Sequence, residues 1–215
     1  MEILFENRSL IVAIKPPSLV SEQTPDGDGF ADLLAAKNGG YIGVIHRLDR
    51  GVGGVMIYAK THDAASRLSS LAQEHRLGKE YLAVIEGCPD ECAGELRDLL
   101  YYDRAKNKVF PVSRERRGVK SALLSYRVIA SVTDPQSGKL LSLVSVTPHT
   151  GRTHQIRVQF ASRGYPLLGD RRYGGSASGG ISLWCRAIEL PAMGKESARK
   201  IEQNPTGYPW DLFDP

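Results

Sequence analysis

The chain has 215 residues, of which 41% are hydrophobic and 24% are charged, as is ordinary for a folded globular protein and unlike an intrinsically disordered one. It has no run of about 18 uninterrupted apolar residues, and its N-terminus lacks the basic segment of a signal peptide. The net charge of +4 is mild, so composition excludes membrane and secreted classes but identifies no partner.

The first sixty residues predict short strands and one helix. The apolar run Leu10 to Ile14 predicts a buried strand that ends at Lys15-Pro16-Pro17, because proline removes a ladder donor. Apolar residues at helical spacing predict a short helix over Phe30 to Lys37. Two further apolar runs, Tyr41 to Ile45 and Gly54 to Ala59, bracket a charged turn.

The next sixty residues predict an amphipathic helix, a strand and a basic segment. The helix covers His62 to Leu77, and Gly78 supplies its end. Alternating apolar residues predict a strand over Lys79 to Gly87. Residues 97–118 are polar and basic, which predicts a hairpin or a loop.

The last third predicts strands around one more helix. Ser121 to Ala130 and Leu140 to Val146 read as strands that a Thr-Asp-Pro-Gln-Ser-Gly turn joins. Thr153 to Arg163 reads as a helix with Thr153 as its N-cap and Gly164 at its end. The remaining predictions are a glycine-serine loop over Gly174 to Gly180, a last strand over Ile181 to Leu190, and a polar tail from Pro191.

These elements do not alternate as regular βαβ units. We therefore expect one α+β domain over residues 1–215, with a mixed, mostly antiparallel sheet and flanking helices. Three cysteines, at positions 88, 92 and 185, are too few for a disulfide framework. We expect reduced thiols in the cytoplasm; a zinc site formed by these cysteines with a histidine is the less favoured alternative.

The basic residues are concentrated in two windows. Residues 97–127 hold nine Lys or Arg and three acids, and residues 150–175 hold five Arg and one acid. The windows carry +6 and +4, so the rest of the chain carries −6. One such window is often a solvated loop, but two on an otherwise acidic chain favour a polyanion site. Tyr101, Tyr102, Phe110 and Tyr173 lie within them and suit unstacked bases.

Residues 46–50, His-Arg-Leu-Asp-Arg, place one carboxylate between two arginines in a turn. Alone, this pattern is equally typical of a surface turn with weak local ion pairs. Glycines at positions 51, 53 and 54 follow at once and permit close approach of a ligand. We interpret Asp49 as a candidate reactive group.

Four ordered segments resemble the RluA-type pseudouridine synthases. The His-Arg-Leu-Asp-Arg turn with Gly54 and Ala59-Lys60-Thr61 resembles the family's signature. Lys15-Pro16-Pro17 is similar to its N-terminal Lys-Pro motif. Residues 79–87 resemble its tyrosine strand, and residues 150–158 with 164–174 resemble its third segment. The resemblance covers roughly residues 3–190, and it leaves no room for the N-terminal S4-like RNA-binding module of many members.

The resemblance implies the pseudouridine synthase catalytic fold, with a central RNA-binding cleft, and an enzyme that isomerises a uridine of tRNA or ribosomal RNA. Asp49 would be the nucleophile, attacking the uracil ring or the ribose C1′; a glycal route through C2′ is the alternative. Arg157 would hold that carboxylate ionised, with Arg47 as the weaker candidate, and Tyr81 would stack on the flipped base and could also help to remove the C5 proton. Substrate contacts are expected from Arg47, Arg50, Arg152, Ile156 and Leu168, although Ile156 and Leu168 also read as core. We expect His46 and His154 to be structural.

We expect no cofactor, no metal, no membrane association and a monomer. Two departures from the family pattern are Val52-Gly53 where Thr-Ser is common, and Leu183-Trp184-Cys185-Arg186-Ala187 in place of a Leu-His-Ala pattern. Two other classes stay open. One is a non-catalytic RNA-binding protein or chaperone; the other is an N-glycosidase that would use Asp49 to release uracil.

Overall fold

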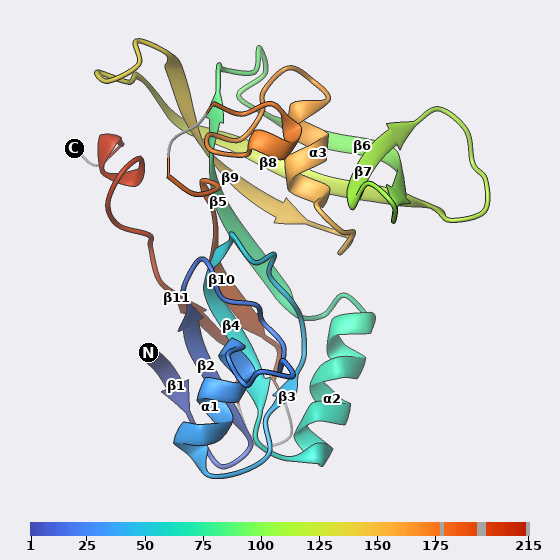
Figure 1. The fold of residues 1–215 in the computed structure, drawn as a ribbon, viewed down its shortest axis with the longest axis vertical. Coiled ribbons are helices and arrows are strands. Elements are labelled where there is room, and N and C mark those ends of the chain that lie inside the picture. The colour runs from blue at the N-terminus through green and yellow to red at the C-terminus, as the bar shows by residue number, and fades with distance from the viewer. Residues whose placement is uncertain (177–178, 193–196, 214–215) are drawn as a thin grey trace. The chain divides into compact units, whose positions relative to one another are not determined.

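The structure, a computed structural model, describes residues 1–176, 179–192 and 197–213. The chain folds as two compact units (Figure 1). The first unit contains Met1–Lys79 and Trp184–Pro205, and the second contains Glu80–Leu183 and the residues from Thr206 onward. No helix within the described ranges is long and apolar enough to cross a membrane. That both units together form one catalytic domain over residues 1–215 stays a prediction.

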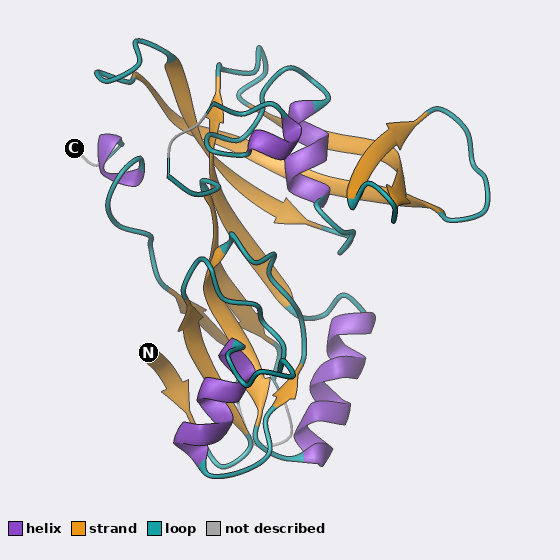
Figure 2. Cartoon of the chain, in the orientation of Figure 1, coloured by secondary structure: helices purple, strands orange, loops and turns teal. Residues whose placement is uncertain are grey.

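The first unit is built on a sheet with the strand order β1-β2-β4-β10. β2 is antiparallel to β4, whereas β4 and β10 are parallel; β3 pairs with β4, and β11 pairs with β10. Helices flank this sheet (Figure 2). The elements are β1 (Ile3–Glu6), β2 (Leu10–Lys15), α1 (Phe30–Asn38), β3 (Gly43–Val44), β4 (Gly53–Ala59), α2 (His62–Gln73), β10 (Leu183–Leu190) and β11 (Arg199–Glu202).

The core of the first unit lies around β4, all of whose residues are buried. Phe30 of α1 meets Tyr58 of β4 edge to face, with ring centroids 5.8 Å apart. The Tyr58 hydroxyl is satisfied inside the core because it donates to the Ser21 carbonyl at 3.0 Å. The side chains of α1 and β4 thereby fix the segment that follows Lys15-Pro16-Pro17.

The second unit is an antiparallel sheet with the order β5-β9-β8-β6-β7. Helix α3 packs beside β6 and β7 (Figures 1 and 2). Its elements are β5 (Gly78–Glu86), β6 (Ala93–Asp103), β7 (Lys108–Val112), β8 (Val119–Thr133), β9 (Leu140–Pro148), α3 (Gln155–Ala161), and the short 3-10 helices η1 (Arg171–Tyr173) and η2 (Trp210–Leu212). The predicted α+β class, with a mixed and mostly antiparallel sheet and flanking helices, is confirmed.

Two predicted helix ends are wrong. Helix α2 ends at Gln73 rather than Leu77, because His75 takes a left-handed φ of 57° and the chain closes with an Arg76 N–H to Leu71 carbonyl bond of 2.8 Å. Thr153 is not the N-cap of α3. That helix begins at Gln155 behind His154, whose φ of 50° is left-handed and whose side chain does not cap the helix.

The C-terminal segment is more ordered than the predicted polar tail. β11 adds a strand to the first unit, and Trp210, Leu212 and Phe213 pack against the apolar cluster of Val84, Leu141 and Leu168. Three apolar side chains within four residues are too few to form a periodic pattern, so the sequence did not predict this packing. Of the predicted loop and tail, residues 177–178, 193–196 and 214–215 lie outside the described residues.

Gly54 makes a close backbone contact with the partner strand β10. Its φ is 128°, and a Cβ placed there would lie 2.3 Å from the Cys185 carbonyl oxygen and 2.5 Å from the Cys185 nitrogen. These atoms belong to the parallel partner strand, so they cannot move without breaking the β4–β10 pairing.

We predict that Gly54→Ala lowers the free energy of unfolding by about 3 kcal/mol or more, from backbone strain plus the clash with Cys185. Gly138→Ala is the matched control, because Gly138 also has a positive φ of 69° but has nothing within 4 Å of a Cβ. Urea unfolding would measure both variants. Equal losses would show that the close approach of the two strands contributes nothing.

Candidate active site

The His-Arg-Leu-Asp-Arg turn lies in the loop between β3 and β4, where Asp49 is half-buried. Ser21 holds this loop twice, since its hydroxyl donates to the Leu48 carbonyl and accepts the Leu48 N–H, both at 2.9 Å. The Arg50 carbonyl accepts the Ser18 N–H at 2.9 Å. The Val52 N–H to Asp49 carbonyl bond of 2.9 Å closes the turn. The backbone that carries the Asp49 carboxylate is therefore fixed by bonds to residues 18–21.

Lys15 supplies a buried cation in the same unit. Its side chain is fully buried, and Nζ donates to the Pro16 carbonyl at 2.9 Å and the Leu19 carbonyl at 2.7 Å. Burial lowers the pKa of Lys15 to about 8, and the negative charges of Asp49 and Glu22 act in the opposite direction. The sequence identified Lys15 as part of a motif; its electrostatic coupling to Asp49 emerges only from the fold.

His46 is buried at the start of the turn. Its Nε2 accepts the Ile57 N–H of β4 at 3.3 Å. Burial, assisted by the positive charge of Lys79, lowers the pKa of His46 to about 3, so the imidazole is neutral at physiological pH. These contacts agree with the structural interpretation of His46.

The two arginines of the turn, Arg47 and Arg50, are exposed. Arg47 pairs with Glu22 at 2.7 Å, but its side chain is 70% exposed, so the pair is weak. Both guanidinium groups can therefore reach a partner in solution at little cost.

Tyr81, in the second unit, lies in β5 opposite Val146 of β9 and is buried. Ile156 and Leu168 are buried too, and Leu168 packs with Val84 and Leu141. Their burial agrees with the interpretation of both as core, and their predicted contact with substrate stays a prediction. Arg152 donates through Nε to the Ser121 carbonyl at 2.8 Å.

Arg157 is buried on α3 and forms a bidentate ion pair with Asp170. Nε donates to Oδ2 at 2.6 Å, and Nη2 donates to Oδ1 at 2.9 Å. The two side chains are 6% and 1% exposed. Sequence reasoning missed Asp170 as this partner. The signal was present, because Asp170 is the single acid between residues 150 and 175.

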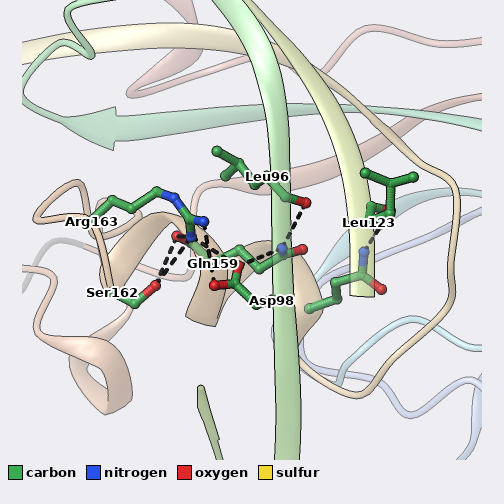
Figure 3. A network of polar contacts seen from close by, with 7 residues as sticks. Leu96, Asp98, Leu123, Gln159, Ser162 and Arg163 are labelled. Atoms are coloured by element: carbon green, nitrogen blue, oxygen red, sulfur yellow. Dashed lines mark hydrogen bonds and ion pairs between the residues drawn. The ribbon is translucent and has the colours of Figure 1, made fainter. Parts of the chain in front are cut away.

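Polar contacts fix helix α3 to the sheet (Figure 3). Gln159 is fully buried, and its Nε2 donates to the Leu96 carbonyl at 3.0 Å and to Asp98 at 2.7 Å. Arg163 pairs with the same Asp98 at 2.9 Å. At the other end, Gln155 donates to the Leu123 carbonyl at 3.0 Å. The helix that carries Arg157 is thus held to both β6 and β8.

The two basic windows meet within the second unit. The Tyr173 hydroxyl accepts the Val109 N–H at 2.9 Å, and the Lys108 ammonium lies 5.2 Å from the centre of the Tyr173 ring. Arg116 lies 4.7 Å from the Tyr101 ring centre. Cations and aromatic rings therefore alternate here, as they do on surfaces that bind single-stranded nucleic acid.

Comparisons with known proteins point to one family. The family model described as RNA pseudouridylate synthase matches residues 9–162. The tRNA pseudouridine synthase C of Haemophilus ducreyi is 30% identical over 184 residues, which cover 81% of this chain and 74% of that protein. The ribosomal large subunit pseudouridine synthase D of Borreliella burgdorferi is 34% identical over 163 residues, covering 74% of this chain and 47% of that protein.

Among solved structures, the human RNA pseudouridylate synthase domain containing 1 has the same fold, with a TM-score of 0.80 at 21% identity; the match covers 95% of this chain and 83% of that one. The chain spans 47% to 59% of the length of several curated relatives. The family match covers more than half of the chain and includes both Asp49 and Arg157. The chain therefore belongs to the RNA pseudouridylate synthase family.

Proposed function

We propose that the chain is an RNA pseudouridine synthase, an isomerase that converts a uridine of structured RNA to pseudouridine. The observation that carries the proposal is the Asp49 turn, which keeps one carboxylate on a backbone fixed by Ser21 and Ser18. The reaction detaches uracil from its ribose, rotates it and rejoins it through carbon 5. Its first step needs a positioned carboxylate and no change of oxidation state.

Asp49 is the proposed nucleophile. An ionised carboxylate can attack the uracil ring or the ribose C1′, and a glycal route would instead remove a proton from C2′. Within the same unit, the negative charge of Asp49 raises the pKa of the buried Lys15 and so supports its ammonium form. Arg157 is proposed to act on the same reaction from the second unit.

Tyr81 is proposed to stack on the uracil rather than to act as the base. An ordinary phenol has a pKa of about 10, so it is a weak base at neutral pH. Stacking on a rigid ring would offset part of the few kcal/mol that flipping a base out of structured RNA costs.

RNA contacts are proposed for the two basic windows of the second unit and, separately, for Arg47 and Arg50 of the first unit. Phosphate contacts from arginine give affinity without reading sequence, and Arg152 is the candidate within the second window. Relatives are named for tRNA and for the large ribosomal subunit, and we propose these two RNA classes as substrates. We also propose a cytoplasmic location, in which the three free cysteines would stay reduced, and a monomer.

Two competing functions give different products. A non-catalytic RNA-binding protein would retain RNA without changing it. An N-glycosidase would leave abasic RNA and free uracil. The presence of Asp49, Tyr81 and Arg157 within one family match favours the isomerase over both.

We predict that Asp49→Asn abolishes turnover, by about 10³-fold or more, because an amide is not a nucleophile, while RNA affinity stays near that of the wild type. Release of tritium from RNA labelled at uridine C5 measures turnover, and filter binding measures affinity. Asp63→Asn, an exposed carboxylate on α2, is the matched control. Tritium release by Asp49→Asn at the wild-type rate would overturn the assignment.

We predict that reversing Arg114, Arg116 and Arg117 to Glu weakens RNA binding and lowers the salt slope of log K by about 0.7 to 0.9 for each phosphate that the variant no longer neutralises. All three side chains are exposed. The control triple variant reverses Arg8, Lys37 and Arg67, which are exposed in the first unit outside the basic windows. An unchanged slope for the first variant, or equal changes for both, would show that residues 114–117 do not contact RNA.

A further inference from the structure

The contacts around Arg157 exceed what anchoring a helix requires. Asp170 occupies the Nε and Nη2 positions of the guanidinium with bonds of 2.6 and 2.9 Å. This bidentate geometry fixes the plane of the guanidinium and the direction in which Nη1 points. Helix α3 is already held by Gln155 and Gln159, so the ion pair is not needed to keep the helix in place.

Asp170 stands on a turn that is built tightly around it. Its carbonyl accepts the N–H groups of Tyr173 and Gly175, at 3.0 and 2.9 Å, and its own N–H donates to the Leu167 carbonyl at 3.0 Å. A Cβ on Gly175 would lie 2.1 Å from that same Leu167 carbonyl, so glycine is required there. Leu167 in turn bridges to Ile85 of β5. These backbone bonds fix the position of Asp170 relative to the sheet of the second unit.

Tyr173 covers the face of the same guanidinium. The Arg157 Cζ lies 5.2 Å from the centre of its ring. The phenol oxygen accepts the Val109 N–H at 2.9 Å and lies 2.9 Å from Nδ1 of His154. The phenol oxygen is thus bonded on two sides, by the Val109 N–H and by the His154 ring, and the direction of the second bond depends on the histidine tautomer. His154 and Val109 therefore hold the ring that holds Arg157.

The ion pair has a consequence for the role of Arg157. Arg157 and Asp170 together carry no net charge, so the pair acts on another group through the direction of its N–H bonds more than through a net positive field. We propose that Asp170 and Tyr173 are positioning residues that set the orientation of the Arg157 guanidinium for the uridine isomerisation. This inference rests on the proposed function.

The test is a double-variant cycle measured under single turnover. Wild type, Asp170→Asn, Arg157→Ala and the double variant are incubated with total RNA labelled at uridine C5 with tritium, taken from cells that lack the gene. We expect Asp170→Asn to lower the rate of tritium release by about 10- to 100-fold, as misplacement of a reacting group does, with RNA affinity within about twofold of wild type. Adding Asp170→Asn to Arg157→Ala should cause no further loss.

A merely structural Asp170 gives a different result. Its substitution would then multiply the loss caused by Arg157→Ala, and that additivity would overturn the inference while leaving the proposed function intact. Absence of tritium release by the wild type would overturn the proposed function and the inference with it. Asp63→Asn, which also removes the carboxylate partner of an arginine but at an exposed site, should release tritium at the wild-type rate.

Tyr173 keeps the inference testable if Asp170→Asn fails to fold. Tyr173→Leu removes the ring and should lose about tenfold, whereas Tyr173→Phe keeps the ring but loses the hydroxyl bonds to Val109 and His154, so its loss should be smaller than that of Tyr173→Leu. Melting temperatures of both variants are compared in parallel. Equal rates for the two variants, or a greater loss for Tyr173→Phe, would overturn the inference.

Discussion

The buried ion pair between Arg157 and Asp170 fixes the plane of the Arg157 guanidinium in the second unit. Burying two charges costs several kcal/mol for each ion, and the cost is offset only when the geometry is good and the remaining polar atoms find partners. Here the pair is bidentate, an aromatic ring covers the guanidinium, and the turn beneath Asp170 satisfies its backbone. A chain that needed only stability could achieve it with apolar residues, so the pair indicates a requirement for orientation.

The first unit solves a similar problem with backbone bonds instead of side-chain charge. Asp49 lies in a loop, where function is common but positional freedom is a cost. Ser21 and Ser18 remove that freedom by bonding the loop on both sides of Asp49, and the charge of Asp49 raises the pKa of the buried Lys15. In each unit, a reactive or charged side chain is thus held by residues that are distant from it in the sequence but close to it in the fold.

The sequence predicted the α+β class and most strands because alternation and apolar runs report burial directly. It missed the true start of α3, because His154 adopts a left-handed backbone that no local pattern announces. It missed the Asp170 partner of Arg157 because an ion pair thirteen residues apart has no periodic signature. It also predicted a polar C-terminal tail. Trp210 and Phe213 are too few to form a periodic pattern, and their burial depends on packing against residues of distant strands.

The central claim is that this chain isomerises uridine within RNA. Nucleoside mass spectrometry, on RNA from cells that lack the gene and before and after incubation with the purified protein, tests it most directly. Our account predicts that pseudouridine rises by the amount that uridine falls, with no free uracil, because isomerisation conserves every atom of the nucleoside. Free uracil with abasic RNA, or RNA that is bound but unchanged, would contradict it.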